Sequence, residues 1–127
     1  IWEEAWEITE RLVAAMFSES QKKDVDFMAF TIGTTLQAHP EKLRRKGYME
    51  VYDIEDLFYP GDRIKAVGDR FGFPVTNLER NFQSHVDTTQ ECLHGFTSEY
   101  CGGHWNDKGH ELAGKILAYD VCQAINN

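Results

Sequence analysis

Two short apolar runs, each set between helical segments, constrain the fold of this 127-residue chain most strongly. The first, 24–33, is rich in β-branched and aromatic residues and ends at Gly33, and the second, 73–78, has Pro74 near its start. Apolar runs of this kind are typical of strands that lie in a parallel sheet and are covered by helices on both faces. The sequence therefore predicts a layered α/β fold.

Most of the remaining sequence has helical periodicity. A first helix is expected from Trp2 to about residue 20, with two tryptophans on a buried apolar stripe. Pro60 and Gly72 are placed to begin and end another helix, and Asn106 is placed to cap the last one. Short helical segments are also expected in 41–46 and within 79–91. With the partly helical segment 79–91 left aside, the order helix, strand, helix, helix, strand, helix gives a thin sheet of two strands.

Composition limits the classes of partner. The chain is long enough for one domain, 1–127, with its own core. Thirteen basic residues against 21 acidic ones leave a net charge of −8, which argues against nucleic acid as a partner. No stretch approaches the roughly 20 apolar residues that a membrane span requires. The sequence predicts a soluble, acidic domain and does not distinguish a cytoplasmic from an exported one.

The segment around His104 is the motif most suggestive of chemistry. Two glycines precede His104, and a helix capped by Asn106 follows it. The positive end of the helix dipole disfavours an imidazolium ion, so His104 is expected to favour the uncharged form that a general base requires. Spacing alone leaves open whether this histidine is functional or structural.

The block 103–110, Gly-His-Trp-Asn-Asp-Lys-Gly-His, resembles the C-terminal block of the SGNH (GDSL-type) esterase and lipase family. Segments 56–60 and 70–75 resemble the parts of that family that precede the block, so the resemblance extends over essentially the whole chain. It implies a three-layer α/β/α, flavodoxin-like fold with a parallel sheet. This chain would be the C-terminal portion of such a domain, with about two strands and three to four helices.

The same resemblance assigns roles to the residues of the block. His104 would be the base that activates a serine nucleophile towards an ester substrate, and no cofactor is implied. Gly103, Trp105 and Asn106 would neighbour the site, with Trp105 packed beside it and Asn106 capping the helix. His110 is interpreted as a packing or surface residue.

The chain departs from the family pattern in two ways. It has no Gly-Asp-Ser nucleophile motif, and its serines are interpreted as surface or capping residues: Ser18, Ser20, Ser84 and Ser98. The family's aspartate just before the histidine is also missing, and Glu99 and Asp107 are the possible substitutes. The sequence therefore predicts part of an ester hydrolase that supplies the base and is inactive alone.

Two readings of the cysteines stay open. Cys92 and His94, together with Cys101 and His104, could form a loose Cys2His2 zinc site, although their spacing is unusual. Alternatively, Cys92 and Cys101 could form a local disulfide that holds the loop before His104. Cys122 would then stay free as a packing residue.

A non-catalytic assembly unit is the alternative to an enzyme. Two strands and several amphipathic helices would leave a sheet edge and apolar surface uncovered. A second copy of the chain, or a missing N-terminal half of the domain, would cover both.

Overall fold

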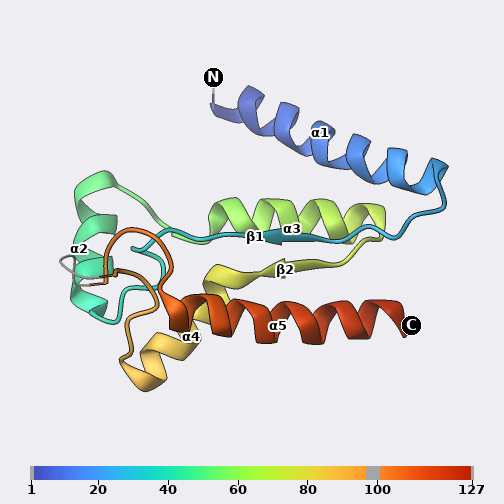
Figure 1. Ribbon diagram of the computed structural model, residues 1–127. Coiled ribbons are helices and arrows are strands. Elements are labelled where there is room, and N and C mark those ends of the chain that lie inside the picture. Colours follow the sequence, from blue (N-terminus) through green and yellow to red (C-terminus); the bar gives the residue numbers. More distant parts are fainter. Residues whose placement is uncertain (1, 97–100, 127) are drawn as a thin grey trace.

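The computed structural model describes residues 2–96 and 101–126. Its elements follow one another as α1 (Trp2–Lys22), β1 (Ala29–Thr31), α2 (Lys42–Tyr52), α3 (Tyr59–Phe71), β2 (Val75–Asn77), α4 (Leu78–Thr89) and α5 (Asp107–Ile125) (Figure 1). The protein is thus mixed α/β, mostly helical, with a small sheet. No helix in the described part of the chain is both long and apolar enough to cross a membrane.

The sheet is the parallel pair that the sequence predicts. Ala29 pairs with Val75 and Thr31 with Asn77, and the connection between the strands runs through α2 and α3. In Figure 1, α3 lies along one side of the two strands and α5 along the other, with α1 outside α3. The predicted burial of the first strand on both faces is wrong, however, because no residue of β1 is buried and Phe30 is 48% exposed.

The core lies beside the sheet rather than around it. Its buried members are Leu78, Phe82 and Val86 of α4, together with Ala38, Leu93 and Ala113. Trp105 and the apolar residues of the first half of α5 pack against this cluster and are half-buried. The segment that contains His104 is therefore anchored between α4 and the beginning of α5.

The predicted burial of the first helix is wrong. No residue of α1, all of which is described, is buried, and Trp2 is 82% exposed. Polar and aromatic contacts attach the helix: Arg63 of α3 pairs with Glu10 and Glu3, and Trp6 packs edge-on to Tyr59 at 5.8 Å between ring centroids. Phe17, near its end, packs against Phe27 and Phe73. Trp2, Leu12 and Met16 of the predicted stripe are more than half exposed.

The residues predicted to begin and end helices are confirmed more fully than the predicted lengths of the helices and strands. α3 has Pro60 in its first turn and ends at Gly72, whose φ of 84° suits glycine. β1, in contrast, spans only three residues of the predicted run, because β2 offers only three partners before α4 begins. The expected helix at 41–46 continues through Gly47 to Tyr52.

Candidate functional site

His104 lies on the wall of a cavity of about 540 Å³. One side of the cavity is the segment that follows β1, from Ile32 to Thr35, and the other is the turn 103–105 before α5. His94, Phe96 and His110 complete the lining. The cavity therefore forms where the carboxyl end of β1 meets the amino end of α5, and three imidazoles border it.

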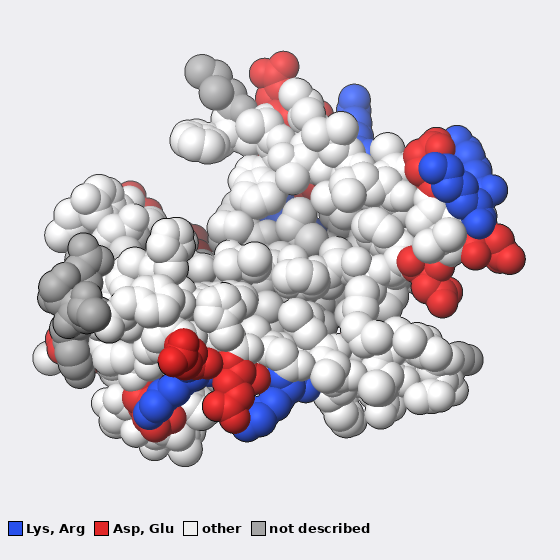
Figure 2. Space-filling view, in the orientation of Figure 1, with Lys and Arg blue, Asp and Glu red and all other residues white. Residues whose placement is uncertain are grey.

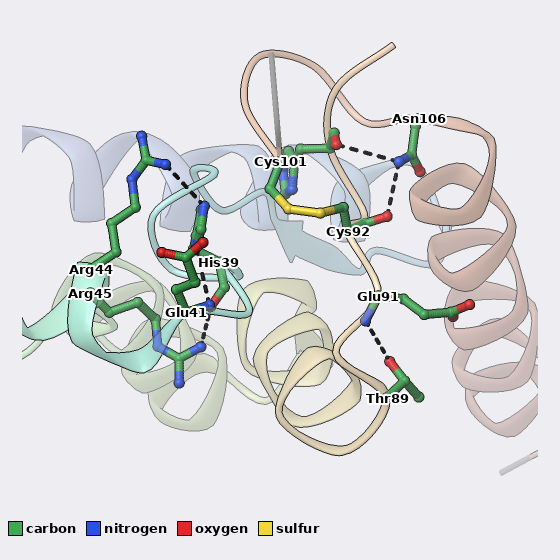
Figure 3. The surroundings of a disulfide bond; sticks show 10 residues. His39, Glu41, Arg44, Arg45, Thr89, Glu91, Cys92, Cys101 and Asn106 are labelled. Atoms are coloured by element: carbon green, nitrogen blue, oxygen red, sulfur yellow. Dashed lines mark hydrogen bonds between the residues drawn. A yellow bond between two sulfur atoms is a disulfide. The ribbon is translucent and has the colours of Figure 1, made fainter. Parts of the chain in front are cut away.

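Asn106 fixes the turn that carries His104. Its Oδ1 accepts from the Gly109 N–H at 3.0 Å, which caps α5, and its Nδ2 donates to the Cys92 carbonyl at 2.9 Å. Figure 3 shows Asn106 beside the Cys92–Cys101 pair. The His104 carbonyl accepts from the Gly95 N–H at 2.9 Å. The capping role predicted for Asn106 is confirmed, and the same side chain also ties α5 to the segment 92–95.

A disulfide joins Cys92 to Cys101 and closes the loop before His104 (Figure 3). This confirms the disulfide reading, and the Cys2His2 zinc reading is wrong because the two sulfur atoms are bonded to each other. In the part of the chain that the structure describes, no three side chains of metal-ligand type are grouped for an ion. Cys122 is free but exposed, so its predicted packing role is wrong.

Gly109 allows α5 to approach the segment before the disulfide loop. A Cβ at this position would overlap the carbonyl oxygen of Leu93. That segment also pairs with the turn through a single antiparallel bridge between His94 and Trp105. Glycine is therefore required at 109 by the closeness of two backbones.

Trp105 connects the cavity to the core. Its ring lies 4.9 Å from that of Phe82 and 5.6 Å from that of His110, between centroids, and it is half-buried. Trp105 thus lines the same cavity as His104, and His110 lines it from the first turns of α5.

The structure brings no described carboxylate to His104. The His104 side chain is exposed and makes no hydrogen bond within the described residues. Asp107 is exposed in the first turn of α5 and makes no described hydrogen bond to His104. Glu99, the other candidate acid, lies outside the described residues, as does Ser98. Gly103 lies on the cavity wall with a φ of 75°.

Sequence reasoning missed the second imidazole of the site. His94 is only 4% exposed, and its burial lowers its pKa to about 4, with a smaller contribution from His39. The sequence suggested His94 only as a metal ligand, since a single histidine between Leu93 and Gly95 carries no other signal. Its burial depends on Phe82 of α4, whose ring centroid lies 6.2 Å away.

Comparison of this chain with protein-family models, with curated proteins and with solved structures returned no match. The interpretation of the site therefore depends on its geometry and on the motif at 103–110.

Proposed function

We propose that this chain is the base-bearing part of an ester hydrolase of the SGNH type, with His104 as the general base. The observation that carries the proposal is the position of His104: it is exposed on a cavity at the carboxyl end of β1. In open α/β sheets, ligands bind outside the carboxyl ends of the strands. The His104 carbonyl also accepts from the Gly95 N–H, and Asn106, two residues later, donates to the Cys92 carbonyl, so the turn that carries His104 is fixed.

The chemistry assigned to His104 is proton transfer in two directions. The imidazole accepts the proton of a serine hydroxyl as its oxygen attacks the ester carbonyl, and it then gives that proton to the leaving alcohol. No described serine lines the cavity, since Ser18 and Ser20 lie on α1 and Ser84 on α4. The serine and the oxyanion donors would come from further strands beside β1, in a three-layer α/β/α, flavodoxin-like domain. A carboxylate from Glu99 or Asp107 remains the proposed orienting group.

A cysteine placed in the cavity tests the base directly, because it supplies the missing nucleophile. Thr34 is exposed and lines the same cavity as His104, so Thr34→Cys should be acylated by a p-nitrophenyl ester in a burst of p-nitrophenol. Adding His104→Ala should slow the burst about 100-fold, the low end of what general-base catalysis contributes. Stopped-flow absorbance measures both rates, and the unmodified chain should give only the background rate.

His110→Ala provides the matched control, because His110 lines the same cavity. In the Thr34→Cys background this variant should keep the burst. Equal burst rates with and without His104 would contradict the proposed base. Steady ester hydrolysis by the unmodified chain that disappears in His104→Ala would support the base and would place a nucleophile within the chain or its dimer.

A second candidate function, that of an assembly unit, is supported by the uncovered edge of β1. Within the described part of the chain β1 pairs only with β2, and its neighbouring apolar residues are open: Phe30 is 48% and Ile32 65% exposed. Figure 2 shows a broad area without charged side chains in the middle of one face, with charges at its rims. An open strand edge with apolar neighbours favours pairing with another chain.

Light scattering over a concentration series tests this candidate. The chain should self-associate, and Phe30→Lys should keep it monomeric because a lysine on an edge strand opposes pairing. Leu43→Lys is the matched control, since Leu43 is exposed on α2, away from the strand. A folded chain that stays monomeric at every concentration would contradict self-assembly.

A further inference from the structure

His94 is a buried histidine whose ring has no hydrogen-bonding partner in the described part of the chain. The contact that holds the ring is with Phe82, at 69° between the ring planes. Every fully enclosed side-chain nitrogen or oxygen among the described residues has a hydrogen-bonding partner. Because the ring nitrogens of His94 have none, they are not fully enclosed. The space that the residue lines is the His104 cavity, and we conclude that its nitrogens open onto that cavity.

The ring offers both a donor and an acceptor there. Burial keeps the pKa of His94 near 4, so at neutral pH the imidazole is uncharged, with one N–H and one bare nitrogen. Among the described residues, no lysine, arginine, aspartate or glutamate lines this cavity. The described lining is therefore suited to an uncharged ligand that hydrogen bonds, and it holds no lysine or arginine to pair with a carboxylate.

We propose that His94 is a ligand-binding residue of the His104 cavity, where its ring hydrogen bonds to the carbonyl group of an uncharged acyl compound. This inference rests on the proposed function only in taking the acyl compound to be an ester. It adds separate roles for the two histidines, in which His94 binds the substrate and His104 transfers the proton.

The position of His94 suits a binding residue. Its backbone pairs with Trp105 in the antiparallel bridge, and its carbonyl accepts from Asn106 Nδ2 at 3.4 Å. The same contacts therefore place His94 and His104 relative to each other. Since Phe82 supports the ring from the core, the ring is oriented before a ligand arrives.

Imidazole ¹⁵N NMR with butyramide tests the inference, because this uncharged acyl compound resembles a butyrate ester and is not hydrolysed. Titration of the 127-residue chain should shift the ring signals of His94 saturably. Butyrate, the charged analogue, should bind at least about tenfold more weakly, because no described lysine or arginine lines the cavity to pair with its charge. His39 is an internal control, because it is buried but lines a different cavity.

His94→Phe keeps a ring of similar size and removes both nitrogens, so it should weaken butyramide binding about tenfold or more. Backbone amide spectra establish that the variant is folded, and His94→Leu, which also lacks both nitrogens, replaces it if it is not. The inference is overturned if butyramide produces no saturable shift, if it shifts His104 but not His94, or if His94→Phe binds it equally well. Because no reaction occurs, binding through His94 can hold even if the Thr34→Cys experiment rejects His104 as a base, and the reverse is also possible.

Discussion

Replacing Phe82 with alanine should lower the free energy of unfolding by about 3–5 kcal/mol, as for other large-to-small changes in a core. Phe82 is 2% exposed at the centre of the cluster formed by α4, Leu93 and Ala113. Its ring also supports Trp105 and His94, so the cavity left by alanine would lie directly under the candidate site. Urea denaturation followed by circular dichroism measures the loss.

Two matched variants locate the origin of that effect. Phe82→Leu keeps most of the volume and should cost only about 1 kcal/mol, as volume-conserving changes do. Phe71→Ala removes the same ring from an exposed position at the end of α3 and should change stability by less than about 0.5 kcal/mol. Equal urea midpoints for Phe82→Ala and Phe71→Ala would contradict the described core.

Acidification from pH 7 to pH 4 should lower the free energy of unfolding by about 3 kcal/mol through His94 alone, at 1.36 kcal/mol for each unit of pKa difference. In the folded chain burial lowers the pKa of His94 from its ordinary value of 6.5 to about 4. The unfolded chain therefore binds the proton first as the pH falls. The contribution of His94 to stability is complete above pH 6.5 and is lost progressively down to about pH 4.

Urea denaturation at a series of pH values measures this loss, and His94→Phe should reduce its slope between pH 6.5 and 4. Burial also lowers the pKa of His39, which adds to the loss in the same direction, so the slope should shrink rather than vanish. Hydrogen bonds from Arg63 and Lys108 lower the pKa values of Glu10 and Glu91, and their contribution is lost only at lower pH. An unchanged slope in His94→Phe would contradict a buried, uncharged His94.

The parts of the fold that the sequence predicts are those that depend on local chemistry. Pro60 and Gly72 mark the beginning and end of α3, and Asn106 caps α5, because each acts on the backbone within a few residues. The burial of α1 could not be predicted in this way. Periodicity identifies the apolar face of a helix but does not show whether another element covers it.

In the candidate site, too, the sequence predicts the features that depend on nearby residues and not those that depend on distant ones. The motif at 103–110 predicts His104 just before a helix, and the structure places it there. The opposite wall of the cavity, 32–35, lies some 70 residues earlier in the chain, and no spacing in the sequence connects the two. His94 could not be singled out because its burial and its lowered pKa both arise from α4 packing against the loop.

The contact between Gly109 and the Leu93 carbonyl also limits how this sequence can diverge. Any descendant that keeps α5 at this distance from the loop must keep a residue without a side chain three positions after Asn106. Exposed positions of the same helix, such as Glu111 and Lys115, carry no such restriction. An asparagine followed three residues later by glycine should therefore be kept in related sequences even where His104 has been replaced.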